Sequence, residues 1–192
     1  VPVISREELA ASSMVANPGC YPTASMLGLA PALRAGIIDN NVIIDAKSGV
    51  SGAGRGLSLK THYSEVNENV SAYGLDGHRH MPEIAQELSE AAGEEVKVTF
   101  VPHLIPMTRG ILATSYASIS EEFLESEKDV GDSIKEIYRT SYQEEEFVKV
   151  TDSPPMTKQT LGGNDCRVYP NVDERTGRMI VVSCIDNLVK GA

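Results

Sequence analysis

The chain has 192 residues, of which 41% are hydrophobic and 23% are charged, as is usual for a single soluble globular domain. Its 17 basic and 27 acidic residues give a net charge of -10, which argues against nucleic acid as the main partner because no broad cationic surface can neutralise phosphates. The sequence has no apolar run near the ~20 residues of a membrane span. Its start, VPVISREELAAS, also lacks the basic and apolar regions of a signal peptide, so we expect neither export nor membrane insertion.

The three cysteines, Cys20, Cys166 and Cys184, lie far apart in the sequence. They fit no CxxC metal pattern, and pairing any two would leave an odd thiol. This usage predicts a reducing compartment, and we expect the protein to be cytoplasmic.

The first predicted element is a short helix. Ser5 and Glu8 form a capping box, in which each side chain can bond the backbone amide of the other residue. Residues 14–17, MVAN, then read as a brief buried strand.

A second helix is predicted from Tyr21 to Gly36, because small and apolar residues recur there at helical spacing. Pro31 should kink or split this helix, since its ring has no N–H and clashes with the preceding turn. The β-branched residues 41–48, NVIIDAKS, then predict a strand.

Further along, residues 81–93 predict an amphipathic helix that begins near a proline and ends at a glycine. The segments at 96–102 and 110–119 predict strands, and the second alternates between two faces from Ile111 to Ile119.

The last third of the chain predicts a surface helix at 131–143, a short strand at 147–150 and a hairpin at 165–186 that turns near Thr176 and Gly177. The final residues suggest a helix that starts at Asp186 or Asn187. This order favours an α+β fold with a mixed, largely antiparallel sheet covered by helices.

Cys20 occupies a position that favours reactivity. Pro18 and Gly19 predict a tight turn before it, and Pro22 suits the first turn of a helix, so the thiol should lie at a helix N-terminus. There the unpaired amides and the helix dipole would lower the thiol pKa and could hold an oxyanion. The alternative is a small apolar residue packed at a strand-to-helix corner, which is the usual role of free cysteines. Cys166 and Cys184 lack such a turn and are expected to be packing residues.

A nucleophilic thiol needs a proton partner, and the segment GHRHMPEI offers His78, His80 and Glu83 at the start of a helix. Two other interpretations stay open for this segment: an HxHxxE metal site, and a polar helix entry exposed to water. His62 and His103 are expected to be structural residues.

Two segments are suited to binding an anion. The segment at 47–56, KSGVSGAGRG, combines mobile glycines with two hydroxyls and two cations. It is neither a P-loop nor the dinucleotide fingerprint, since Leu57 stands where GxGxxG would need glycine. Arg109, in VPHLIPMTRG, could also reach an anionic ligand.

Four motifs occur in order: NPGCYPTA, SGVSGAGR, HRHMPEI and FVPHLIPMTRG. Together they resemble the N-acetyl-gamma-glutamyl-phosphate reductase family of arginine biosynthesis, which is related to aspartate-semialdehyde dehydrogenase. The resemblance implies a homo-oligomeric (dimeric or tetrameric) enzyme that uses NADPH to reduce the acyl phosphate N-acetyl-glutamyl 5-phosphate to the 5-semialdehyde through a cysteine thioester. It also implies the fold of the C-terminal catalytic domain of glyceraldehyde-3-phosphate and semialdehyde dehydrogenases.

The resemblance assigns roles to particular residues. Cys20 becomes the nucleophile and His78 the preferred acid/base. The expected substrate contacts are Ser48, Ser51, Arg55, His80, Glu83 and Arg109. Gly49 and Gly52 are expected to let the nicotinamide approach the backbone, and no metal is implied.

The family carries a Rossmann half with a glycine fingerprint, and this sequence contains no such fingerprint. We therefore expect residues 1–192 to be the catalytic and dimerisation domain, which by itself binds NADPH weakly or not at all and has little turnover. Strands near 110–119 and 166–184 are expected at the sheet edge as subunit contacts. Three other functions stay open: a paralogue acting on aminoadipate phosphate, a cofactor-free cysteine hydrolase or acyltransferase, and a non-catalytic dimerisation module.

Overall fold

The computed structural model describes residues 6–192, apart from the side chain of Glu8. The predicted capping box of Ser5 and Glu8 therefore lies outside the described residues, and the first helix is α1 (Arg6–Ala11). The strand predicted at 14–17 is wrong, because these residues are exposed and pair with no neighbouring strand. Without a partner strand, the backbone N–H and C=O groups of this four-residue segment lack the hydrogen bonds that strand pairing would provide.

Seven strands form one sheet in the order β2-β3-β1-β4-β7-β6-β5. The strands are β1 (Ile38–Ser48), β2 (Ser71–Ala72), β3 (Lys97–Leu104), β4 (Ile111–Ile119), β5 (Val148–Val150), β6 (Cys166–Asp173) and β7 (Arg178–Ile185). The β1–β3 and β5–β6 pairs are parallel and the other four pairs are antiparallel. The predicted α+β class with a mixed, largely antiparallel sheet is confirmed.

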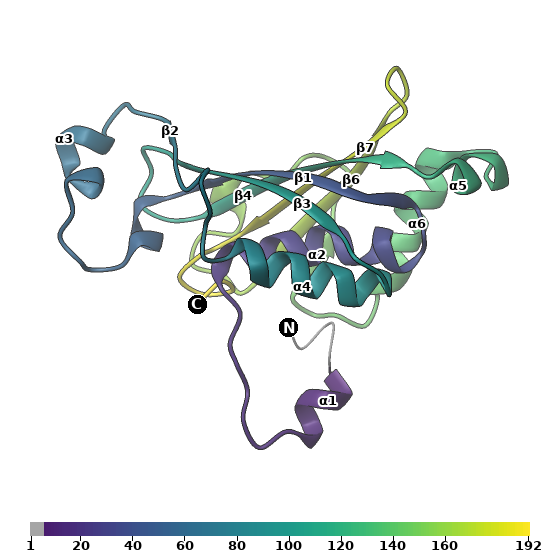
Figure 1. The fold of residues 1–192 in the computed structure, drawn as a ribbon, viewed down its shortest axis with the longest axis horizontal. Coiled ribbons are helices and arrows are strands. Elements are labelled where there is room, and N and C mark those ends of the chain that lie inside the picture. Colours follow the sequence, from purple (N-terminus) through teal and green to yellow (C-terminus); the bar gives the residue numbers. More distant parts are fainter. Residues whose placement is uncertain (1–5) are drawn as a thin grey trace.

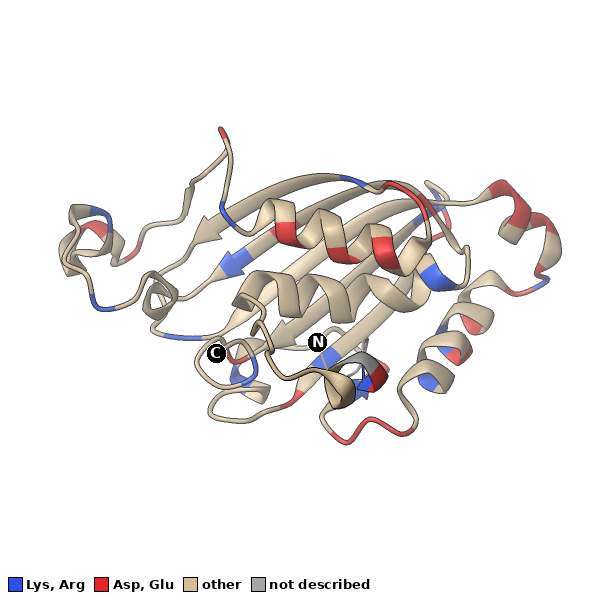
Figure 2. Ribbon diagram, turned by 60° about the horizontal axis from the view of Figure 1, so that its bottom comes forward, with Lys and Arg blue, Asp and Glu red and all other residues tan. Residues whose placement is uncertain are grey.

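Three long helices cover one face of the sheet, and no helix of the described residues covers its other face (Figure 1). They are α2 (Cys20–Arg34), α4 (Met81–Ala92) and α6 (Val130–Tyr142). The shorter helices are α3 (Tyr63–Val66), α5 (Glu121–Ser126), η1 (Val50–Ala53), η2 (Leu59–Thr61) and η3 (Thr157–Gln159). Figure 2 shows α2 and α4 lying side by side across the strands, with the charged residues of α4 on its outer side.

Strand β4 confirms the predicted alternation, since Ile111, Ala113, Ser115, Ala117 and Ile119 are all buried. The prediction that this strand and the 166–184 hairpin lie at the sheet edge is wrong. β4 lies between β1 and β7, and β7 lies between β4 and β6. The edges are the short strands β2 and β5, so any contact through β4 and β7 must use the sheet face.

The centre of the fold is α2, whose residues from Tyr21 to Leu33 are all buried. The helix is not split at Pro31, which lies inside it. Pro31 has no N–H for the carbonyl of Leu27, four residues earlier. The Tyr142 hydroxyl donates to that carbonyl at 2.7 Å, and the Tyr138 hydroxyl donates to the carbonyl of Gly28 at 2.7 Å. Two tyrosines of α6 thus bond the backbone of α2 beside the proline.

The helix predicted from Asp186 or Asn187 is wrong, because residues 187–191 form turns. Asp186 and Asn187 are instead buried, and their side chains bond distant loops. Residues 50–80 form an arm between β1 and α4, which contains η1, η2, α3 and β2 and projects past the sheet (Figure 1).

Replacing Tyr142 by Phe is expected to lower the free energy of unfolding by about 1–3 kcal/mol, because the buried Leu27 carbonyl loses its donor. Urea unfolding followed by circular dichroism measures this loss. Tyr63→Phe is the matched control, since Tyr63 is 78% exposed. Equal stability of the two variants would show that Pro31 needs no compensating bond.

Candidate active site

A pocket of about 600 Å³ opens where the parallel strands β1 and β3 end. Ser48 and Leu104, the last residues of these strands, line it together with Cys20 at the start of α2. The arm and the segment before α4 supply its other walls. Carboxyl ends of parallel strands and N-termini of helices are common places for ligand binding, because free backbone amides face the ligand there.

Cys20 is the first residue of α2, and Gly19 is its N-cap, as predicted. The predicted lowering of the thiol pKa is wrong. Burial raises the pKa of Cys20, and this effect outweighs the lowering by the Tyr21 and Cys20 amides and by Arg79. The thiol is therefore protonated at neutral pH and needs a base to become a nucleophile.

His78 and His80 lie together beside this thiol pocket, with ring centroids 4.9 Å apart. The backbone N–H of His80 donates to Nδ1 of His78 at 3.1 Å, so His78 is neutral at that nitrogen and carries its proton on Nε2. Burial lowers the pKa of both histidines; His80 and Arg79 lower that of His78 further, and Arg79 that of His80. Both rings are therefore neutral at pH 7.

The turn before Cys20 is fitted to His80. A Cβ added at Gly19 would lie 2.6 Å from Nε2 of His80, so only glycine leaves room for this ring. The N–H of Gly19 donates to Oε1 of Glu83 at 3.0 Å, which ties the turn to the first turn of α4. Of the two candidate histidines, His80 thus packs directly on the residue before Cys20.

Comparison with known proteins assigns the fold. The model of the semialdehyde dehydrogenase dimerisation domain matches residues 20–187. The chain belongs to this family. Solved structures agree: aspartate semialdehyde dehydrogenase II from Vibrio cholerae superposes over the whole chain and 63% of its own with a TM-score of 0.72, at 16% sequence identity.

Curated relatives are much closer in sequence. The N-acetyl-gamma-glutamyl-phosphate reductase of Dehalococcoides mccartyi is 51% identical over the whole chain, and that of Desulforamulus reducens is 53% identical. The chain spans 55% of the length of each.

Within the domain, six of the predicted site residues line the pocket and four do not. The lining residues are Cys20, Ser48, Gly49, Gly52, His78 and His80. Those outside the lining are Ser51, Arg55, Glu83 and Arg109. Arg55 is exposed, and Glu83 bonds the Gly19 amide.

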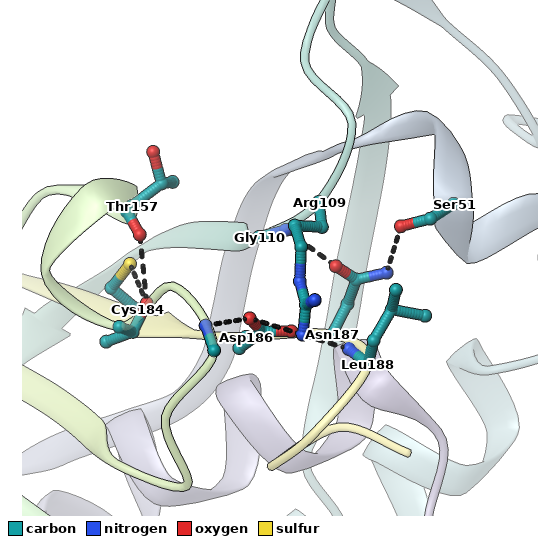
Figure 3. A network of polar contacts seen from close by, with 10 residues as sticks. Ser51, Arg109, Gly110, Thr157, Cys184, Asp186, Asn187 and Leu188 are labelled. Atoms are coloured by element: carbon teal, nitrogen blue, oxygen red, sulfur yellow. Dashed lines mark hydrogen bonds and ion pairs between the residues drawn. The ribbon is translucent and has the colours of Figure 1, made fainter.

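Arg109 and Ser51 belong to a partly buried polar network (Figure 3). Arg109 pairs with Asp186 at 2.8 Å, and Asp186 also accepts from the amides of Gly162 and Leu188. Asn187 accepts from the amide of Gly110 at 2.6 Å and donates to Oγ of Ser51 at 3.0 Å. The network joins the end of the chain to the loops at 49–53 and 105–110.

Gly49 has a structural role in this arrangement. A Cβ there would lie 2.6 Å from the backbone nitrogen of Arg109, and the two loops exchange backbone bonds through Gly49 and Gly110. The space left by the missing side chain of Gly49, which was expected to admit a nicotinamide, is therefore filled on this side by the backbone of Arg109.

Sequence reasoning missed several pocket residues, chiefly Tyr21, Lys60, Tyr73 and Arg79. Tyr21 and Tyr73 lie with their hydroxyls 3.0 Å apart. Of these residues, only Arg79 could have been identified from the sequence, because it lies between the two histidines of the HRH motif. Tyr73 reaches the pocket only because β2 pairs with β3.

Leaving aside the side chain of Glu8, residues 6–192 contain no group of three His, Cys, Asp or Glu side chains placed to hold a metal ion. Within the same residues, no helix is both long enough and apolar enough to cross a bilayer.

Replacing Asp186 by Asn is expected to lower the free energy of unfolding at pH 7 by roughly 2–4 kcal/mol, since it leaves the Arg109 cation without its partner. Burial opposes the ionisation of Asp186, but the bonds from Arg109, Gly162 and Leu188 prevail and lower its pKa. The advantage of the wild type should be complete above about pH 4, the unfolded value, and shrink as the pH falls through the lower folded pKa.

Urea unfolding at pH 7 and below pH 4 measures this dependence. Asp152→Asn serves as control, because Asp152 is 87% exposed in its pair with Arg139 and should change stability little. A wild-type advantage that persists unchanged in acid would contradict the role assigned to the Asp186 carboxylate.

Replacing Gly19 by Ala is expected to displace the His80 ring and to cost about 1–3 kcal/mol of stability, because the new methyl group overlaps the ring. NMR of the histidine ring protons reports the displacement directly. Gly56→Ala is the control, since a Cβ there meets nothing within 4 Å. Unmoved His80 resonances in the Gly19 variant would refute the packing.

Proposed function

We propose that this protein is an NADP-dependent reductase that converts N-acetyl-glutamyl 5-phosphate to N-acetyl-glutamate 5-semialdehyde and phosphate. The observation that carries the proposal is a pocket in which Cys20, at a helix N-terminus, lies with two neutral imidazoles. The name shared by the relatives near 50% identity supports the choice of substrate.

The first half of the reaction follows from the resting protonation states. A neutral imidazole removes the proton of the Cys20 thiol while the sulfur attacks the acyl carbon. The carbon–oxygen bond to phosphate breaks and leaves a thioester on Cys20. The imidazolium formed in this step then protonates the departing phosphate.

The second half releases the aldehyde. Reduction of the thioester needs a hydride, which NADPH supplies when it is bound. Collapse of the resulting thiohemiacetal alkoxide breaks the carbon–sulfur bond and releases the aldehyde and the Cys20 thiolate, which regains its proton from solvent. Gly52 lines the pocket beside Ser48, where a Cβ would lie 3.1 Å from the Ser48 hydroxyl, and we assign this wall to the nicotinamide.

The packing of the His80 ring on Gly19, the residue before Cys20, favours His80 over His78 as the base. The ring of His78 lies 4.9 Å from that of His80, and its Nδ1 accepts from the His80 amide while Nε2 carries the proton, so neither nitrogen of His78 is free to accept another. We assign the first proton transfer to His80 and a supporting role to His78, which reverses the preference drawn from the sequence.

Assembly into a homo-oligomer is proposed through the helix-free face of the sheet. Neighbouring strands place Ile43, Tyr116 and Ile180 in one row across this face, and Val182 lies in the adjacent row. Ile43 is 39% exposed. Asp45 and Thr114 share the row of Val182, so this face is partly polar, and its apolar row is what a second copy would cover.

The proposal predicts that iodoacetamide labels Cys20 faster than Cys166 or Cys184, because the other two side chains are fully buried. Since burial raises the pKa of Cys20, its labelling rate should keep rising above about pH 8.5, the ordinary thiol value. Mass spectrometry of peptides from a pH series measures the three rates.

Cys20→Ser should reduce NADPH-dependent turnover by the complete enzyme at least about 10³-fold. Cys184→Ser is the matched control and should retain activity. Even labelling of all three thiols would remove the nucleophile, and ester hydrolysis without NADPH would identify a cofactor-free acyl transferase instead.

A further inference from the structure

Two cations of the pocket have no role in the reaction described so far. Arg79, from the segment before α4, and Lys60, from η2, both line the pocket and are exposed. Neither makes an ion pair with an Asp or Glu of the described residues. The two arginines that the sequence predicted as substrate contacts do not meet both conditions. Arg109 is paired with Asp186, and Arg55 does not line the pocket.

A chain with a net charge of -10 repels a multiply charged anion at long range. An acyl phosphate carries a phosphoryl dianion next to the carbon that the thiol attacks. The pocket lining includes one opposing carboxylate, that of Glu65. Unpaired cations inside the pocket are therefore needed to bind such a substrate.

Arg79 is the better placed of the two cations. It lies in sequence between His78 and His80, whose rings both face the thiol pocket. Its charge opposes the rise in the pKa of Cys20 and of Tyr73 and lowers the pKa of both histidines, so its field reaches the thiol and both imidazoles. A guanidinium presents a fork of N–H donors that matches two phosphate oxygens.

We propose that Arg79, assisted by Lys60, forms the subsite that receives the phosphoryl group beside Cys20. This inference rests on the proposed function, because it assumes that Cys20 is the reacting thiol. Binding there places the leaving phosphate against a cation that also stabilises the forming thiolate.

The test uses two alkylating agents that differ in charge. Iodoacetate is an anion and iodoacetamide is neutral, so the ratio of their rates at Cys20 reports the local cation, at a pH where thiolate is present. Arg79→Gln should lower this ratio at least about threefold, the effect of one unscreened charge some 6 Å away in water. Lys60→Gln should lower it less.

Arg175→Gln is the matched control, because it removes one cation from the β6–β7 hairpin, where Arg175 pairs with Asp173. This variant should leave the ratio unchanged. Circular dichroism melting of each variant confirms that the fold is intact.

Inorganic phosphate provides the second readout. At constant ionic strength it should slow the labelling of Cys20 by iodoacetate in the wild type and lose this effect in Arg79→Gln. Arg79→Lys should restore the rate ratio, which needs only charge, and protect less well, because lysine lacks the fork.

Two failures are distinguishable. Selective labelling of Cys20 with an unchanged ratio in Arg79→Gln would overturn the anion subsite and leave the nucleophile in place. Equal labelling of all three thiols would instead remove the proposed function on which the subsite rests.

Discussion

Burial of α2 is the constraint on which the rest of the molecule depends. The helix is enclosed along its length by the sheet and by α4 and α6, so its N-terminus has one position. Its small residues allow this enclosure, and the tyrosines of α6 bond the carbonyls beside Pro31. A helix fixed in this way delivers Cys20 to the ends of β1 and β3 without help from a flexible loop.

The same burial sets the chemistry of the site. Removing the thiol and the imidazoles from water penalises their charged forms, which raises the pKa of Cys20 and lowers those of His78 and His80. The resting site is a neutral acid beside neutral bases. When an electrophile arrives, the proton passes from the thiol to an imidazole. The positive charge of Arg79 then offsets part of the free-energy cost of forming the Cys20 thiolate in a buried site.

Local signals in the sequence were sufficient for the parts of the fold that local physics decides. The turn before Cys20, the alternation in β4 and the glycine that ends α4 were all predicted correctly. The failures involve partners far away in the chain. Asp186 and Asn187 have the residue types of a helix N-cap, but their side chains are taken by Arg109 and by the Gly110 amide, more than seventy residues earlier.

The glycines around the site were singled out correctly from the sequence, but the structure gives them a different role from the one predicted. Gly49 was chosen for its backbone freedom, yet its missing side chain makes room for the Arg109 backbone. Gly19 makes room for His80 in the same way, and a Cβ on Gly191 would lie 2.8 Å from that of Cys20. Each close approach involves a segment distant in sequence. The sequence therefore shows that a glycine is present, but only the three-dimensional structure shows which neighbour occupies the space of its missing side chain. Gly191 thus lies against Cys20 on one side, and a substrate reaches the thiol from the pocket that Arg79 and the two histidines also line.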